Sequence, residues 1–235
     1  MKAKRDLFIS GSTLKMIAVV TMLIDHVAAY LLSDDPACVS TLFTVMGEPV
    51  SIVSAMRFVG RLAFPIFCFL LVEGFEHTSN RNRYGMYLLL FALLSEIPFD
   101  LVQTNGWNPN QQNVFFSLWL GYLGIYIPSL WSSDFFNRVL CLMMITVAVI
   151  CCQSDYGLCG FLFILSMYYM RRGLMGKMIA GTVLLSNPIG VAMATLPIGL
   201  YNGQRGFITG NWLKYSFYAF YPVHLLVIYL CRQFY

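Results

Sequence analysis

The chain has 235 residues, of which 58% are hydrophobic and only 11% are charged, and its mean hydropathy is +0.68. Soluble domains average about 25% charged residues, so this composition excludes an ordinary soluble protein. It predicts an all-α, polytopic membrane helical bundle, formed as a single integral-membrane domain over residues 1–235 with no soluble domain. The net charge of +4 comes with no basic stripe, which argues against nucleic acid as a partner, and the seven cysteines include no CxxC pair that would indicate a metal site.

The apolar stretches predict about eight transmembrane helices, because one span needs about 20 mostly apolar residues. They lie at residues 13–32, 54–74, 84–103, 113–130, 138–153, 158–170, 178–200 and 215–233. The seventh stretch contains Pro188 and Pro197, so the sequence leaves open whether it spans the membrane as a broken helix or re-enters it.

The first predicted span carries Asp25 and His26 inside an apolar segment. A titratable group at that depth costs about 2.5–3.5 kcal/mol on the milder insertion scales, so it is expected to be paired, to face a polar cavity or to take part in chemistry. Lys15 precedes His26 by eleven positions, which places both on one helix face about 16 Å apart along the axis. We predict His26 as a general base and Asp25 as the partner of Arg57 or Arg61; the alternative is a purely structural hydrogen-bonded pair.

The second predicted span contains Arg57 and Arg61, four residues apart and therefore on one face of a helix. Two like charges inside a membrane need counter-charges or an anionic ligand, and planar guanidinium groups suit phosphate or carboxylate. Glu73 and His77 have the same spacing at the cytoplasmic end of this span. They form either a solvated helix end or an entrance for a charged cofactor.

Further polar residues enter the third, fourth and sixth predicted spans. Glu96 and Asp100 flank Pro98, which kinks a helix because it removes a backbone hydrogen bond. These carboxylates either pair with the arginines or hold an acceptor amine. Asn113 begins the fourth span and Tyr156 precedes the sixth.

The eighth predicted span begins with an aromatic and basic pattern. Lys214, Tyr218 and Tyr221 follow the i, i+4, i+7 spacing, and His224 lies one turn beyond Tyr221. An aromatic belt at the membrane surface accounts for the tyrosines, but it does not account for a histidine at mid-depth beside a proline. His224 is therefore a candidate relay partner for His26.

Loop charges predict the orientation, because short cytoplasmic loops carry an excess of Lys and Arg. Basic residues precede the first span and follow the second, fourth, sixth and eighth, whereas the first outer loop carries Asp34, Asp35 and Glu48. The pattern predicts that both termini are cytoplasmic, with Arg205 and Lys214 as exceptions in the last outer loop. On this topology the polar side chains form a layer in the outer half of the membrane, as a shared cavity would require.

These residues belong to longer motifs that follow one another along almost the whole chain. They are Leu14-Lys15-x-Ile17-Ala18, Met22-x-Ile24-Asp25-His26, Arg57-x2-Gly60-Arg61-Leu62-Ala63-Phe64-Pro65-Ile66-Phe67, Leu71-x-Glu73-Gly74-Phe75-x-His77-Thr78, Ser95-Glu96-Ile97-Pro98-Phe99-Asp100, Asn113-Val114-x-Phe116, Asp155-Tyr156-Gly157 and Phe217-Tyr218-x-Phe220-Tyr221-Pro222-x-His224. Together they resemble the TraX family, named for the membrane protein that acetylates the N-terminus of F-type conjugative pilin.

That family is similar to the wider class of transmembrane acyltransferases, which carry acyl groups from cytoplasmic coenzyme A to acceptors across the membrane. A basic residue, ten positions and a histidine on the first helix are a signature of that class, and here Lys15 stands where arginine is commoner. The resemblance implies His26 as the catalytic base, and Lys15, Arg57 and Arg61 as residues that help hold acetyl-coenzyme A. It also implies a bacterial inner membrane, contact with membrane lipid, and an acceptor that is a protein N-terminus, a glycan or a lipid.

The full assignment from sequence divides the candidates by role, with no metal. The catalytic residues are His26, Asp25 and His224; the residues for acetyl-coenzyme A are Lys15, Arg57, Arg61, Glu73 and His77; the residues for the acceptor substrate are Glu96, Asp100, Asn113, Tyr156, Lys214, Tyr218 and Tyr221. The alternative function is a proton-coupled small-molecule transporter, in which buried histidines and carboxylates also serve as relays. Paired broken helices would favour the transporter, and the sequence offers at most one.

Overall fold

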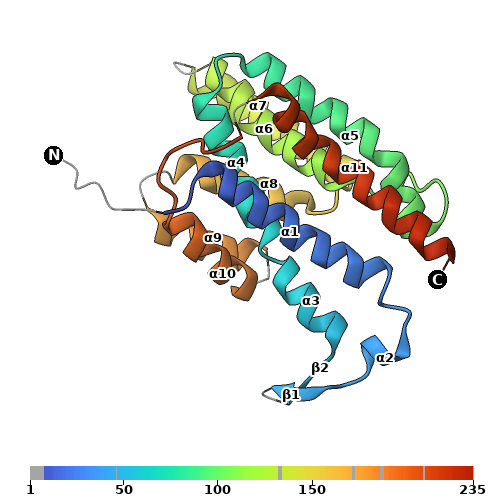
Figure 1. Ribbon diagram of the computed structural model, residues 1–235. Coiled ribbons are helices and arrows are strands. Elements are labelled where there is room, and N and C mark those ends of the chain that lie inside the picture. Colours follow the sequence, from blue (N-terminus) through green and yellow to red (C-terminus); the bar gives the residue numbers. More distant parts are fainter. Residues whose placement is uncertain are drawn as a thin grey trace. The chain divides into compact units, whose positions relative to one another are not determined.

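The computed structural model of this protein is almost entirely helical, as Figure 1 shows, which confirms the all-α class. It describes residues 8–45, 47–131, 134–170, 173–185, 188–208 and 210–234. The helices are α1 (Gly11–Tyr30), α2 (Pro36–Val39), α3 (Ile52–Gly60), α4 (Ala63–His77), α5 (Arg81–Thr104), α6 (Val114–Leu130), α7 (Phe135–Cys152), α8 (Gly157–Tyr169), α9 (Leu174–Leu184), α10 (Pro188–Gly199) and α11 (Asn211–Phe234), and the strands are β1 (Phe43–Val45) and β2 (Glu48–Val50).

Among the described residues, four helical stretches are long and apolar enough to cross a membrane. They are α1, α3 together with α4, α5, and α7, whereas α6, α8, α9 and α10 are apolar but shorter. The expected count of about eight spans is therefore not confirmed. Helix α7 exposes large apolar side chains, including Phe135 at 79% and Met144 at 65%. Such a surface suits lipid rather than water, which supports a membrane protein.

Two of the predicted spans are interrupted. The second has a turn at residues 61–62, between α3, which ends at Gly60, and α4, which begins at Ala63, but the two helices together form one stretch long enough to cross a membrane. The seventh consists of two separate helices, α9 and α10. The stretch between α1 and α3, expected to be a loop, contains α2 and an antiparallel hairpin of β1 and β2 in which Phe43 pairs with Val50.

The chain forms two compact units. The first contains Met1–Phe67, Pro98–Gly106 and Ile189–Tyr235, and the second contains Cys68–Ile97 and Trp107–Pro188. Helices α4 and α5 each contribute to both units. The core of the first is the packing of α1 against α3 and α11. In the second, α6 packs against α7 and α8 around Leu120, Ile145, Val149 and Phe161.

The beginning of α1 is joined to the segment that leads into α11. The amide groups of Gly11 and Ser12 donate to the carbonyl oxygens of Gln204 (2.8 Å) and Arg205 (2.9 Å). The Ser12 hydroxyl donates to the Arg205 carbonyl (2.7 Å) and accepts from the amide of Ile208 (2.9 Å). The first amides of α1 are thus satisfied by residues 204–205 rather than left open.

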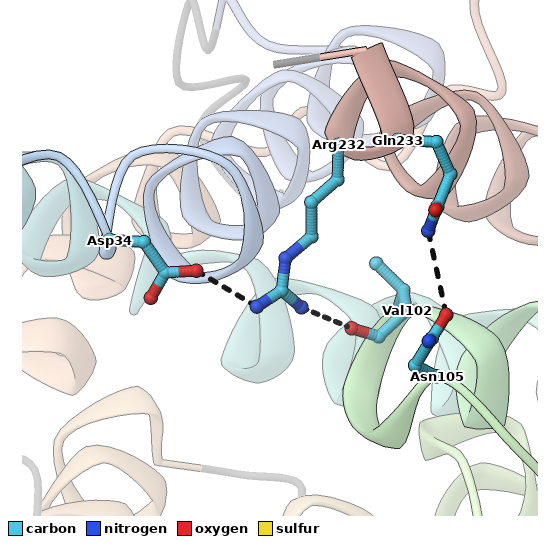
Figure 2. Close-up of polar contacts among 5 residues, drawn as sticks. All are labelled: Asp34, Val102, Asn105, Arg232 and Gln233. Atoms are coloured by element: carbon cyan, nitrogen blue, oxygen red, sulfur yellow. Dashed lines mark hydrogen bonds and ion pairs between the residues drawn. The ribbon is translucent and has the colours of Figure 1, made fainter.

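The far ends of α1 and α11 are joined as well, as Figure 2 shows. The guanidinium of Arg232 binds the carboxylate of Asp34 at 2.8 Å and donates to the carbonyl of Val102 at 3.4 Å. One residue further on, the amide of Gln233 donates to the side chain of Asn105 at 3.4 Å. The last turn of α11 therefore lies beside the residues that follow α1 and those that end α5.

These two sets of contacts make α1 and α11 parallel and correct the predicted topology. The sequence placed Asp34 in an outer loop and Arg232 at the cytoplasmic face, yet the two side chains are in contact. The prediction that these two residues lie at opposite faces is therefore wrong, whereas the orientation of the two termini stays a prediction. Arg205 lies at the end of the unit where α1 begins.

Candidate functional site

The two histidines singled out from sequence meet in the first unit. Nδ1 of His26 on α1 lies 2.6 Å from Nε2 of His224 on α11, although 198 residues separate them. The two rings are nearly parallel, with centroids 5.0 Å apart. His224 is buried, with 5% of its surface exposed, whereas His26 is only partly buried. The relay pair expected from sequence therefore exists as a contact.

A backbone carbonyl fixes the hydrogen positions in this pair. Nδ1 of His224 lies 2.8 Å from the carbonyl oxygen of Phe220, and a carbonyl oxygen only accepts, so this nitrogen carries a hydrogen. In neutral His224 the other nitrogen, Nε2, must then accept from Nδ1–H of His26. That in turn leaves Nε2 of neutral His26 as a bare acceptor, with no hydrogen bond among the described residues. The arrangement yields one oriented base at a defined atom.

Aromatic rings surround the imidazole pair. Tyr221 meets both histidine rings edge-on, at 5.9 Å from His26 and 5.6 Å from His224, and the ring of Phe220 stacks on His224 at 4.8 Å. Tyr30, one turn after His26 on α1, approaches its ring at 5.7 Å. Tyr30 was not among the residues predicted from sequence, although it lies four positions after His26 and therefore on the same face of the helix.

Asp25 forms the ion pair that was expected with one of the two arginines. Its Oδ2 lies 2.6 Å from Nη1 of Arg57 on α3, and the charge of Arg61, at the end of α3, also acts on it. Its Oδ1 is buried without a hydrogen-bond partner in the described part of the chain. Asp25 and His26 therefore face different neighbours, as two adjacent residues of a helix must.

Gly60 makes the approach of α3 to α1 possible. A Cβ atom at this position would lie 2.3 Å from both Cβ and Oδ1 of Asp25, far inside contact distance. Only a residue without a side chain fits there, and its place on α3 is three residues beyond Arg57. Sequence analysis included Gly60 in a motif but had no signal for this contact.

Lys15 lies on α1 near the end at which the Arg205 segment is attached, and its side chain is partly buried. Asp100 is buried at 2% exposure, and Tyr218 is partly buried on α11. The side chain of Lys214 lies outside the described residues.

In the second unit, Glu96 and Asn113 bind each other. The Asn113 amide donates to the Glu96 carboxylate and, at 2.8 Å, to the carbonyl of Ala92. Its oxygen accepts from the amide of Phe115 at 3.0 Å and so caps α6. Both side chains are buried, and these hydrogen bonds offset part of the cost of placing them inside an apolar bundle.

Tyr156 takes part in a second set of hydrogen bonds in the same unit. The Ser117 hydroxyl is 2.9 Å from that of Ser154 and accepts from the Tyr156 amide at 3.2 Å. The backbone then turns at Gly157, whose φ of +45° favours glycine, to begin α8. These contacts explain the Asp155-Tyr156-Gly157 motif as the start of a helix.

Glu73 and His77 line a cavity of about 300 Å³ in the second unit. The imidazole Nδ1 of His77 lies 2.9 Å from the Glu73 carbonyl and 3.6 Å from its carboxylate. The remaining lining residues are Phe69, Val72, Glu76 and Lys177. Two carboxylates face one lysine and one histidine here, so these side chains do not form a cationic site for phosphate. The described residues contain no group of three or more His, Cys, Asp or Glu side chains that could hold a metal ion.

The chain is similar to known proteins over almost its whole length. The family model described as "TraX protein" matches residues 10–232. The "Probable fimbrial assembly protein FimC, serogroup H1" of Dichelobacter nodosus is 29% identical over 98% of this chain and 98% of its own length. An uncharacterized protein of Rickettsia prowazekii (strain Madrid E) is 26% identical over 61% of this chain and 49% of its own. No solved structure matches.

Proposed function

This chain belongs to the TraX family, and we propose on that premise that it is an integral-membrane acyltransferase. The reaction moves an acetyl group from cytoplasmic acetyl-coenzyme A to an amine or hydroxyl group of an acceptor. The observation that carries the proposal is the oriented histidine pair, in which the Phe220 carbonyl and His224 leave Nε2 of His26 as the base. The whole-length relative named as a fimbrial assembly protein favours a protein N-terminus over a glycan or a lipid as the acceptor.

In the proposed mechanism, Nε2 of His26 removes a proton from the acceptor as its nitrogen or oxygen attacks the thioester carbonyl. His26 then carries hydrogen on both nitrogens, and the hydrogen bond to His224 spreads the new positive charge over two rings. When the tetrahedral intermediate collapses, the bond from carbon to sulfur breaks and the thiolate takes the proton from His26. The pair returns to its neutral state.

The donor needs cations for its phosphates and a path for its thioester. Lys15 lies about 16 Å along α1 from His26 on the same face, and Arg205 is attached to the same end of that helix. We assign the phosphates to this end of the first unit. Glu73 and His77 remain proposed residues for acetyl-coenzyme A on sequence grounds.

The acceptor residues proposed from sequence separate into two groups. Asp100, Tyr218 and Tyr221 belong to the first unit with the histidine pair, and we retain them as acceptor contacts. For Glu96, Asn113 and Tyr156 we propose a supporting role, because their hydrogen bonds stabilise α6 and α8. Lys214 remains an acceptor candidate on sequence grounds.

The test is release of free coenzyme A by purified protein in lipid nanodiscs, with peptide, glycan or lipid acceptors. His26→Ala should lower kcat by about 10²–10⁴-fold, the usual contribution of a general base, with the fold retained. His77→Ala is the matched histidine control and should change KM for acetyl-coenzyme A without that loss of kcat. A His26→Ala protein with the wild-type rate would overturn the proposal, and proton-driven solute flux without thiol release would favour the transporter. Mass spectrometry of cells with and without the protein should then identify the acceptor by its missing acetyl mark.

A further inference from the structure

Arg57 has a part in the reaction that differs from holding the donor. We propose that its guanidinium stabilises the negative charge on the thioester oxygen during acyl transfer, and that Asp25 positions it through their ion pair. The inference rests on the proposed acyl transfer. It assigns to Arg57 a catalytic role and to Asp25 a positioning role.

The geometry of the ion pair leaves the guanidinium available. Nη1 of Arg57 is bound to Oδ2 of Asp25 at 2.6 Å, and this is the hydrogen bond that the described residues give the group. A guanidinium has five N–H donors in a rigid, planar arrangement. One hydrogen bond to Asp25 restrains its orientation, and the remaining N–H groups can donate to a substrate oxygen. The Arg57 side chain is 36% exposed and that of Asp25 19%. The cation is thus reachable from outside, whereas its anchor is more enclosed.

The position of the pair relates it to the base. Asp25 directly precedes His26 on α1, and the ion pair with Asp25 holds Arg57 beside this stretch of the helix. A base and a cation held by neighbouring residues of one helix can approach the same carbonyl group from different directions. A preorganised donor that meets charge only as it develops is usually the largest single contribution to catalysis of acyl transfer.

Arg61 and Tyr221 are two other side chains that could donate to the thioester oxygen, and both suit this role less well than Arg57. Arg61 directly follows α3, and among the described residues no hydrogen bond joins it to Asp25, so no ion pair orients its guanidinium as Asp25 orients that of Arg57. Tyr221 packs edge-on against both imidazoles and has a single neutral O–H donor, whereas a guanidinium offers a full positive charge and several donors.

The step balances in atoms and charge. The acceptor nitrogen or oxygen forms a bond to the thioester carbon as its proton goes to His26, and the carbonyl electron pair moves onto oxygen, where Arg57 donates hydrogen bonds to it. The pair then returns, the bond from carbon to sulfur breaks, and the coenzyme A thiolate leaves with the proton. Arg57 is unchanged at the end.

The experiment compares kcat with KM for acetyl-coenzyme A in the nanodisc assay. Arg57→Gln should lower kcat by about 10²–10³-fold, as loss of an oxyanion donor does, with KM little changed. Arg57→Lys should fall between, because it keeps the charge and loses the fork. Added guanidinium should partly restore Arg57→Ala, and Asp25→Asn should abolish that rescue because the anchor is gone.

Matched controls come from the exposed arginine–aspartate pair just beyond the C-terminal end of α1. Arg232→Gln and Asp34→Asn remove an ion pair of similar length and should leave both kinetic constants unchanged. A raised KM with unaltered kcat in Arg57→Gln would overturn this inference and return Arg57 to donor binding. If the wild-type protein and Arg57→Gln were equally active while His26→Ala was inactive, the inference about Arg57 would be wrong and the proposed function would stand. No thiol release by the wild-type protein with any acceptor would overturn the proposed function as well.

Discussion

Gly60→Ala is the most direct test of how the fold prepares this site. The added Cβ would lie 2.3 Å from Cβ and Oδ1 of Asp25 and 2.6 Å from its Cγ. Carbon atoms pack at about 3.5–4.0 Å, so the approach of 2.3 Å to the Cβ of Asp25 is too short by about 1.2–1.7 Å. Rotation of the Asp25 carboxylate does not remove the clash, because its Cβ is fixed to α1. Helix α3 must therefore move away from α1 and carry Arg57 with it.

The expected effect on the rate exceeds the expected effect on stability. Overpacking of this kind costs about 1–3 kcal/mol in folding free energy. A displacement of 1 Å in a catalytic group costs about 10²-fold in rate, so kcat for thiol release should fall by about that factor while the protein remains folded. The assay is steady-state kinetics in nanodiscs, with thermal unfolding measured on the same samples.

The control is Gly106→Ala, in the same unit. A Cβ at Gly106 meets no atom within 4 Å, so this variant should match the wild type in both measurements. Wild-type kcat in Gly60→Ala would refute the reasoning, because it would mean that the spacing of α3 and α1 does not control the site. Equal losses in both variants would also refute it.

Three further predictions concern the relay, the second unit and the topology. His224→Phe keeps a stacked ring but removes the hydrogen-bond acceptor for Nδ1–H of His26. The kcat for thiol release should therefore fall by about 10–10²-fold, as it does for other groups that orient a functional histidine. His224→Gln offers a side-chain oxygen as acceptor and should retain more activity. Asn113→Ala should destabilise the protein by about 2–4 kcal/mol in unfolding assays, because it removes a helix cap worth about 1 kcal/mol and leaves the buried Glu96 short of a donor, at about 1–3 kcal/mol. A membrane-impermeant maleimide should label a variant whose only cysteine is Cys231 and a second variant whose only cysteine is Phe8→Cys from opposite sides of the membrane, and labelling of both from one side would contradict the parallel course of α1 and α11.

Much of the first unit could be predicted from the sequence, because the patterns that indicate its helices and charged pairs lie within single apolar segments. The apolar segment at 13–32 corresponds to α1, which runs from Gly11 to Tyr30. The cost of placing Asp25 in a membrane correctly predicted a partner among the arginines of the next segment, because a buried charge must be compensated. The same reasoning singled out His26 and His224.

The direction of α11 was not accessible, because it depends on whether the stretch at 178–200 crosses the membrane. Hydropathy records how apolar a segment is, and it is the same for one span and for two half-helices that turn back. The hydrogen bonds of Ser12 with Arg205 and the ion pair of Arg232 with Asp34 decide the matter, because each fixes one end of the helix. One transmembrane crossing more or fewer reverses the predicted membrane side of every loop that follows it in the chain.

By itself, then, the sequence determined that this protein is helical, that it belongs in a membrane and which ionisable side chains needed compensation, since these follow from composition and spacing along one helix. The tertiary structure decided which partners meet. The imidazole contact joins residues 198 positions apart, the Phe220 carbonyl selects which nitrogen of His26 is the base, and Gly60 sets how closely the arginine's helix approaches. Such choices depend on distances between helices, and spacing along one helix does not specify them.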